Sequence, residues 1–332
     1  MKWLVRLVLL LVATMTLAAG GAYWWLDQPL RLTQTPVEVS IEPGVSPAGA
    51  AQAWTQAGVQ ANPRWLQEWF RWSGQWRKVR TGTYLVKEAI TPRQMLDKMV
   101  RGEEILETVT LLEGWTFRQF RQALSKAPQL RQTIATLSDA DVMNAVGAPG
   151  VLPEGRFYPD TYAYSRGVSD VTVLKRAYAT LGQQLDKAWA ARSADSPLKS
   201  KEEALILASI VEKETGLEAD RGKVAAVFNN RLRINMRLQT DPTVIYGLGE
   251  RFDGNLRRRD LLADTPYNTY TRGGLPPTPI AMPGAPSLRA AVKPDASKAL
   301  YFVARSDGSG GSVFSESLDA HNRAVNKFQR GQ

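Results

Sequence analysis

The pattern of apolar and polar positions first predicts a membrane-spanning helix. Residues 7–26 form a run without a charged side chain, and as a helix this run is long enough to cross the ~30 Å hydrocarbon core of a bilayer. Lys2 and Arg6 precede the run, so the positive-inside rule places residues 1–6 in the cytoplasm and the rest of the chain outside. A cleaved signal peptide is the alternative, because residues 18–22 are small enough to suit a signal peptidase.

The next pattern predicts a small α/β subdomain over residues 37–107, reached through a short tether at residues 27–36. Two segments alternate between apolar and polar residues as strands do, and two others have the capping residues and periodicity of helices. The strands are expected at 37–41 and 82–86, and the helices after Asn62 and from Thr91 to Gly102. The first helix is rich in aromatic residues, which suit a hydrophobic core, although such rings can also stack on sugars.

Residues 108–332 show strands and helices in a mixed order, so the chain as a whole is predicted to be α+β. It comprises a transmembrane helix, a small α/β subdomain and this larger mixed domain. In the larger domain we expect a strand at 108–112, helices after the capping Thr116, over 127–150 and over 173–190, and a hairpin-like loop at 308–312.

One predicted helix of the larger domain, at residues 205–216, carries a carboxylate where a surface helix normally carries an apolar side chain. Helical spacing of i, i+3, i+4 and i+7 puts four residues on one face: Leu207, Ile210, Val211 and Glu214. Partial burial raises the pKa of a carboxyl group, which is how a glutamate becomes a general acid near neutral pH. Alternatively, the stem of Glu214 packs against the apolar face while its carboxylate reaches water.

The ends of this helix are also marked in the sequence. Ser200 and Glu203 fit a capping box at its start, and Gly216 fits a stop at its end. Glu212 lies ~200° around the helix from Glu214, so we expect Glu212 and its neighbour Lys213 to be solvated charges.

Composition narrows the function classes. The chain of 332 residues has 42 Lys+Arg against 32 Asp+Glu, a formal net charge of +10 that favours a membrane surface or an acidic polymer as partner. It has the signature of no nucleic-acid-binding module, so we expect no nucleic acid partner. The absence of cysteine excludes disulfides and thiolate chemistry, and with a single histidine a structural zinc site is not expected.

Three segments in a fixed order carry a family resemblance: A-S-I-V-E-K-E-T at 208–215, R-L-Q-T-D-P-T-V-I-Y-G at 237–247, and Y-N-T-Y with G-L-P-P between 267 and 277. Together they resemble the endolytic murein transglycosylases, the YceG-like family of bacterial cell-wall enzymes. The resemblance implies that Glu214, in the E-T pair, is the catalytic acid/base, and that residues 37–107 are a LysM-like subdomain. The segment at 152–162 resembles a family segment near the cleft, where Glu154 and Asp160 either serve the site or fix turns.

Several polar and aromatic residues of these segments are candidates for sugar binding. Amides and guanidinium groups can hydrogen-bond N-acetyl and hydroxyl groups, while tyrosine rings can stack on sugar faces. The candidates are Asn229, Arg231, Gln239, Asp241, Tyr246, Tyr267, Asn268 and Tyr270. For Asn229, Asn268 and Asp241 the alternative is that they cap or turn the backbone. We expect His321 to be structural.

The resemblance implies an enzyme that cleaves peptidoglycan strands between N-acetylmuramic acid and N-acetylglucosamine, without a cofactor, and leaves 1,6-anhydro ends. It also implies a single-pass protein of the bacterial inner (plasma) membrane whose catalytic domain lies in the periplasm, with penicillin-binding proteins and other peptidoglycan synthases as expected partners. Two alternatives remain open. One is a muramidase that uses Glu214 with Asp241, and the other is a glycan-binding scaffold without catalysis.

Overall fold

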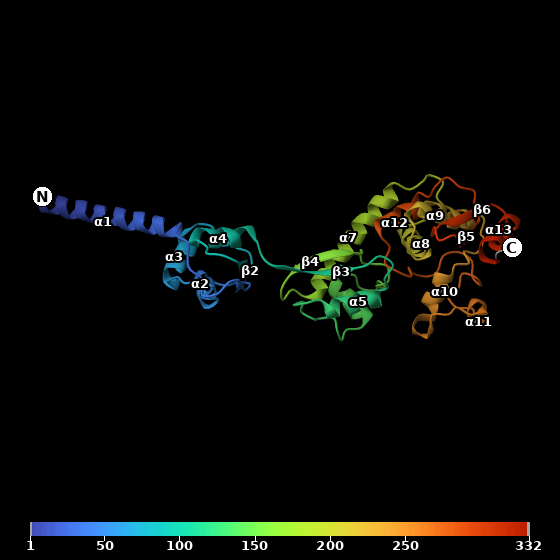
Figure 1. Cartoon of the computed structure of the whole chain (residues 1–332), viewed down its shortest axis with the longest axis horizontal. Coiled ribbons are helices and arrows are strands. Elements are labelled where there is room, and N and C mark those ends of the chain that lie inside the picture. The colour runs from blue at the N-terminus through green and yellow to red at the C-terminus, as the bar shows by residue number, and fades with distance from the viewer. Residues whose placement is uncertain (1, 331–332) are drawn as a thin grey trace. The chain divides into compact units, whose positions relative to one another are not determined.

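The computed structural model describes residues 2–330, and the chain divides into two compact units (Figure 1). The first unit runs to Glu107 and includes Ala163–Gly167, while the second contains Thr108–Tyr162 and the chain from Val168 onward. Helices alternate with three two-stranded sheets, which makes the fold α+β as the sequence predicts. That the first unit resembles a LysM domain stays a prediction.

Helix α1 (Lys2–Leu26) begins before the predicted uncharged run and extends away from the first unit's core. Its side chains from Trp3 to Trp24 are solvent-exposed, and its mean hydropathy over the most apolar window is 2.0. Within residues 2–330 it is the single helix long and apolar enough to cross a membrane. The predicted transmembrane helix is therefore present as a helix of suitable length and composition.

The first unit packs three helices on an antiparallel pair of strands. The strands are β1 (Val37–Ile41) and β2 (Gly82–Val86); the helices are α2 (Pro47–Gln56), α3 (Pro63–Trp72) and α4 (Pro92–Arg101), with a 3₁₀ turn at Trp76–Lys78. Each helix begins with a capping side chain followed by proline at its first turn: Ser46, Asn62 and Thr91. Gly102 ends α4 in the left-handed conformation, as predicted. Helix α2 has no counterpart in the sequence-based prediction.

The predicted tether at residues 27–36 is wrong, because this segment packs along the first unit. Leu30 is 8% exposed, and its backbone N–H donates to the Ile90 carbonyl over 2.9 Å. Leu32 forms a second antiparallel bridge with Val59. Apolar side chains at Leu30 and Leu32 thus attach the segment to the unit's surface, whereas the sequence alone showed chiefly its two flanking prolines.

Strand β3 (Leu106–Leu111), within which the second unit begins at Thr108, pairs with β4 (Asp160–Ser165). Helices α5 (Phe117–Lys126) and α6 (Asp139–Val146) lie between these strands in the chain, and α7 (Asp170–Ala190) follows. Thr116 caps α5 in a full capping box, as predicted. The predicted helix over 127–150 is wrong in extent, since only α6 is α-helical there.

Helix α8 (Lys201–Glu214) is the centre of the second unit. It packs against α7, α9 (Glu218–Arg233), α10 (Asp241–Leu248) and α12 (Ala285–Val292). Every residue from Ala204 to Val211 is buried, so α8 is a core helix and not the surface helix that the sequence suggested.

The remaining elements are the 3₁₀ turn Gly249–Arg251, α11 (Arg258–Leu262), the antiparallel strands β5 (Tyr301–Ala304) and β6 (Ser312–Ser315), α13 (Leu318–Val325) and a π-turn at Asn326–Arg330. The loop between β5 and β6 contains the predicted loop at 308–312 except for Ser312, which begins β6.

Candidate active site

Glu214 is the last residue of α8, where the buried helix reaches the edge of a pocket. Ser200 caps the start of α8 by accepting from the Glu203 N–H, but the Glu203 carboxylate accepts from the N–H of Lys199 and so leaves the predicted capping box incomplete. The helix stops before an extended Thr215, and Gly216 does not take the left-handed conformation expected of a stop. Glu214 itself is half-buried.

The Glu214 carboxylate accepts a hydrogen bond from the hydroxyl of Thr240. Thr240 occupies the N-cap position of α10, yet its side chain does not cap that helix. Its own N–H donates to the Thr269 hydroxyl over 3.1 Å, which fixes the backbone that presents the hydroxyl. Thr240 is a residue that sequence reasoning missed, because its partner lies on a helix 26 positions earlier in the chain.

Burial is the main cause that raises the pKa of Glu214 above its ordinary value. The Thr240 hydrogen bond and the positive charge of Arg231 act in the opposite direction, while the neighbouring Asp241 carboxylate raises the pKa further. The net shift is upward. Glu214 therefore keeps its proton to a higher pH than an exposed glutamate does, which suits a general acid.

Glu214 faces a pocket of about 560 Å³ between α8, the loop before α10, and the β5–α13 region. This pocket brings together residues from all three family segments. Of the predicted site residues it is lined by Glu214, Arg231, Gln239, Asp241 and Tyr270. The Tyr270 hydroxyl donates to the Asp241 carboxylate over 2.6 Å, so the only other carboxylate among the pocket-lining residues is partly occupied.

Gln239 reaches the pocket from a backbone in the left-handed region, with φ of 48°. A non-glycine residue in this region is uncommon and strained, and such strain persists where the surrounding structure enforces it. Here the Gln239 N–H donates to the Thr269 carbonyl over 3.2 Å, and the side chain remains exposed at the pocket. The strained residue thus holds an exposed side-chain amide at the pocket that Glu214 also lines.

Arg231 is a buried part of the pocket wall, and its guanidinium is hydrogen-bonded to backbone carbonyls. Its guanidinium is buried, donates to the carbonyls of Leu300, Arg237 and Leu238, and lies 5.3 Å over the ring of Tyr301. These bonds join α9 to β5 and to the loop before α10. The ring of His321 stacks on the ring of Tyr301, with their centroids 5.3 Å apart. His321 lines the same pocket. Burial and the charge of Arg231 lower the pKa of His321.

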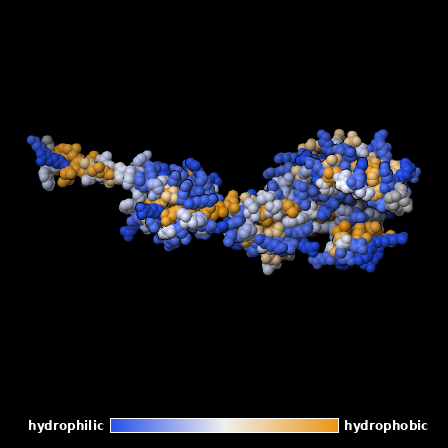
Figure 2. Space-filling view, viewed as in Figure 1, coloured by the Kyte–Doolittle hydropathy of each residue, from blue (hydrophilic) through white to orange (hydrophobic). Residues whose placement is uncertain are grey.

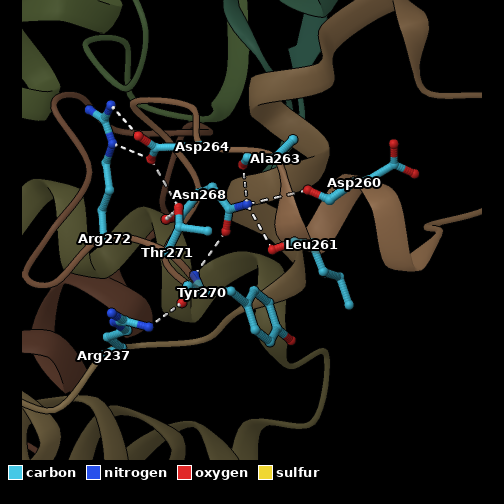
Figure 3. A network of polar contacts seen from close by, with 9 residues as sticks. All are labelled: Arg237, Asp260, Leu261, Ala263, Asp264, Asn268, Tyr270, Thr271 and Arg272. Carbon is cyan, nitrogen blue, oxygen red and sulfur yellow. Dashed lines mark hydrogen bonds and ion pairs between the residues drawn. The ribbon is translucent and has the colours of Figure 1, made fainter.

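The two predicted asparagines lie inside the protein, away from the pocket. Asn268 is 1% exposed; its amide donates to the carbonyls of residues 260, 261 and 263, and its oxygen accepts from the Tyr270 N–H (Figure 3). Asn229 is fully buried and donates to the carbonyls of Ala225 and Ala291. Both therefore fix the backbone, in line with the alternative stated for them. Asn268 shapes the loop that carries Tyr270.

Tyr246 and Tyr267 line a second pocket of about 1020 Å³, which shares no lining residue with the first. Lys213 and Pro242 face this second pocket, whereas their chain neighbours Glu214 and Asp241 face the first. The two tyrosine rings meet edge to face with centroids 4.9 Å apart. The predicted site residues thus separate into two neighbouring hollows.

Glu154 is buried at the second pocket, with 8% of its surface exposed. Its carboxylate accepts from the Phe117 N–H over 3.1 Å and from the Tyr246 hydroxyl over 3.2 Å. Burial raises its pKa to about 7, although both hydrogen bonds oppose the shift. Asp160, by contrast, is exposed and accepts from the Thr161 N–H, which is a turn-fixing contact.

This buried carboxyl predicts a pH-dependent stability. The folded protein keeps the Glu154 proton up to about pH 7, while the unfolded chain releases it near the ordinary value of 4.5. The stabilisation from the protonated group is therefore complete below 4.5 and is lost as the pH rises through 7. Between pH 5 and pH 8 we expect Glu154→Gln to gain ~2 kcal/mol relative to wild type in urea unfolding. Parallel pH profiles for both proteins would contradict this expectation.

The expectation that Glu212 is an ordinary solvated charge is wrong. Glu212 is half-buried, and its carboxylate accepts from the Gly284 N–H over 2.9 Å at the start of α12. Burial and the nearby Glu212 charge raise the pKa of Glu113. Lys213 is exposed as expected, and it donates to the Gly114 carbonyl over 3.2 Å. The helical spacing correctly placed Glu212 and Glu214 on different faces of α8. Because α8 is a core helix, each carboxylate nevertheless has a hydrogen-bond partner: the Gly284 N–H for Glu212 and the Thr240 hydroxyl for Glu214.

The geometry places Glu214, an acid of raised pKa, at the end of a core helix and beside a pocket lined by both polar and apolar side chains. No group of three or more metal-ligating side chains is present in residues 2–330. The sequence pattern of the YceG-like family matches residues 39–327. The chain belongs to the YceG-like family.

Named relatives agree with this assignment. The chain is 29% identical to the endolytic murein transglycosylase of Bacillus subtilis strain 168, over 94% of this chain and 91% of that protein. It is 27% identical to the endolytic murein transglycosylase of Streptococcus pneumoniae serotype 2, over 74% of this chain but only 50% of that protein. A crystal structure of a YceG-like protein from Listeria monocytogenes is similar with a TM-score of 0.54 and 29% identity, covering 88% of this chain and all of that one.

Proposed function

We propose that this protein is an endolytic murein transglycosylase that cuts peptidoglycan strands between N-acetylmuramic acid and N-acetylglucosamine. The observation that carries the proposal is the half-buried Glu214, whose raised pKa suits a general acid, at an open pocket. The names of the relatives from Bacillus subtilis and Streptococcus pneumoniae support the substrate class. No cofactor enters the proposal, since acid–base chemistry alone suffices for the reaction.

In the proposed mechanism Glu214 donates its proton to the glycosidic oxygen, and the bond from that oxygen to C1 of the muramic residue breaks. The substrate's own N-acetyl oxygen stabilises the positive charge that develops at C1. The Glu214 carboxylate then takes the proton of the C6 hydroxyl, and that oxygen bonds to C1 to close a 1,6-anhydro ring. The proton returns to Glu214, and no water is consumed. Thr240 orients the carboxylate through its hydroxyl in both steps.

The second hollow supports an internal cut. Chain neighbours line the two pockets, Lys213 and Pro242 the second and Glu214 and Asp241 the first, and we propose that a strand continues past Glu214 from one pocket into the other. In this arrangement Gln239 and Tyr270 contact sugars on the Glu214 side, and Tyr246 and Tyr267 contact them on the other. Cuts inside a growing strand would end its elongation.

A muramidase is the second candidate, because Asp241 lines the same pocket as Glu214 and hydrolysis ordinarily uses two carboxylates. The Tyr270 hydroxyl bond to Asp241 weakens this candidate, since it engages the carboxylate that would have to activate water. The names of the relatives, endolytic murein transglycosylases, argue against a scaffold without catalysis.

The products distinguish these candidates. If Glu214 acts alone, each cut leaves a 1,6-anhydro-muramic end, which is one water lighter than a hydrolysis product and is not reduced by borohydride. Long strands should shorten before disaccharides accumulate. Mass spectrometry of peptidoglycan digested in ¹⁸O-labelled water is the measurement. Reducible muramic ends that carry the label would replace the transglycosylase with the muramidase, and release of disaccharides from the outset would reject internal cleavage.

We further propose that α1 anchors the protein in the inner (plasma) membrane as a single pass, with residues 1–6 in the cytoplasm and both units in the periplasm. The length and hydropathy of α1 support the anchor, and Lys2 and Arg6 before its uncharged run support the orientation. Peptidoglycan synthases, which act at the same membrane surface, are the proposed protein partners.

A further inference from the structure

Helix α3 of the first unit exposes an aromatic face that the proposed reaction does not use. Trp65 is 58% exposed and Trp72 is 75% exposed, whereas Leu66 and Phe70 on the same helix are fully buried. The two tryptophans are seven residues apart and so share one face, with Trp69 between them. Large exposed aromatic rings grouped on one helix face are typical of a contact surface.

This face adjoins the end of α1. The rings of Trp25 and Trp65 meet edge to face with centroids 5.6 Å apart. Arg93 lies 5.2 Å over the ring of Tyr23 and 5.8 Å over that of Trp69, and it pairs with Asp27 over 2.8 Å. All of these residues belong to the first unit. The direction of α1 therefore fixes where the tryptophan face lies relative to a bilayer.

A mostly apolar groove of about 420 Å³ lies between the two helices. It is lined by Ala18, Gly21, Ala22, Trp25 and Leu26 of α1 and by Trp65, Glu68 and Trp69 of α3, so that Glu68 is its one charged residue. It begins at Ala18 and ends beside Leu26. At 1.5 Å per residue, Ala18 lies ~10 Å deeper along α1 than Trp25. Since Trp24 and Trp25 suit the interface at the end of the span, the groove opens into the outer part of the bilayer. Figure 2 shows the strongly apolar surface along α1, which becomes paler where the helix meets the rest of the first unit.

We infer that the α3 face formed by Trp65, Trp69 and Trp72 is a lipid-contact surface in the outer interface of the membrane, and that the groove beside α1 receives a phospholipid acyl chain. The inference rests on the proposed membrane anchor. Tryptophan is enriched at this depth because its ring is apolar and its N–H is polar. Trp72 shows this arrangement, since its N–H donates to Glu68 over 2.9 Å.

The charges around the face suit phospholipid headgroups. Arg71 lies 5.5 Å over the Trp72 ring, and Arg64 is exposed on the same helix. Arg77 and Lys78 follow in the next turn and are also exposed. Glu68 is the only acid on α3, so the helix and its continuation are strongly basic. Cationic side chains next to interfacial tryptophans bind anionic lipid surfaces.

The absence of cysteine allows a direct test. Glu68→Cys places a single label on the tryptophan face, and Glu42→Cys is its matched control. Glu42 is exposed and directly follows the last residue of β1. The chain from α1 enters β1 at its other end, at Val37. Each full-length protein is labelled with an environment-sensitive fluorophore and placed in nanodiscs of phosphatidylethanolamine and phosphatidylglycerol, with or without nitroxide-labelled lipid.

We expect the label at position 68 to have blue-shifted emission and to be quenched by nitroxide lipid at least about twofold more than the label at 42, because an interfacial helix buries its apolar face ~5–10 Å into the headgroup/acyl boundary. Replacing Trp65 and Trp72 together with serine should remove this difference while leaving strand cleavage unchanged.

Aqueous-like emission at position 68 would overturn the inference, and so would shielding of the label without lipid quenching, which indicates protein–protein contact. Protein released from membranes by alkaline carbonate would instead reject the anchor. The product analysis is independent of both results, so failure of the lipid surface is distinguishable from failure of the proposed activity.

Discussion

Glu214→Gln should reduce the rate of strand cleavage by ~10²–10⁴, the usual contribution of a general acid–base group. The amide has almost the volume of the carboxyl and can still accept from Thr240, so the fold and the pocket should persist. What it cannot do is donate the proton to the leaving oxygen and take it back from the C6 hydroxyl. The measurement is the initial rate of strand shortening by purified full-length protein on peptidoglycan, with thermal unfolding recorded alongside.

The control for this prediction is Glu316→Gln, an exposed glutamate in the same unit. It should keep wild-type activity and change stability by less than ~0.5 kcal/mol, as surface substitutions do. Glu212→Gln is a less suitable control, because it alters the acceptor of the Gly284 N–H at the start of α12. Equal activity losses in Glu214→Gln and Glu316→Gln would show that the acid has been assigned to the wrong residue.

Arg231→Ala should lower the free energy of unfolding by ~3 kcal/mol or more, since charged donors to buried acceptors are worth ~1.5–3 kcal/mol each. The substitution leaves the carbonyls of Leu300 and Leu238, each 2.7 Å from the guanidinium, without this donor. It also removes the contact with the ring of Tyr301. Urea unfolding followed by circular dichroism measures the loss.

Two further variants separate a structural from a substrate-binding role for Arg231. Arg231→Lys keeps the charge but not the planar fork, so it should recover only part of the stability. Arg118→Ala removes an exposed arginine paired with an exposed glutamate, and it should cost less than ~1 kcal/mol. If Arg231→Ala leaves stability unchanged and lowers activity alone, Arg231 contacts substrate and is not the wall of the pocket.

Local sequence signals predicted the elements whose stability is local. Caps at Thr91 and Thr116 marked two helix starts correctly, because the capping side chain and its N–H partner are three residues apart. Strand alternation at 37–41 matched the burial pattern of β1. The helix predicted over 127–150 was too long, because only α6 is α-helical there. Helical propensity is a weak signal, and tertiary packing overrides it in the flanking residues.

The sequence by itself determined the apolar N-terminal helix and the α+β class, and it singled out Glu214 as the candidate acid, since each depends on residues within one segment or on an ordered set of segments. Tertiary structure alone decided that Thr240 holds Glu214, that Asn229 and Asn268 fix backbone instead of facing the pocket, and that Glu212 is engaged. It also decided that α8 is buried all round from Ala204 to Val211 and that the aromatic face of α3 adjoins α1. The physical reason is that burial and hydrogen bonding depend on which distant segments meet, and these partners lie from a few to more than 70 positions apart in the chain.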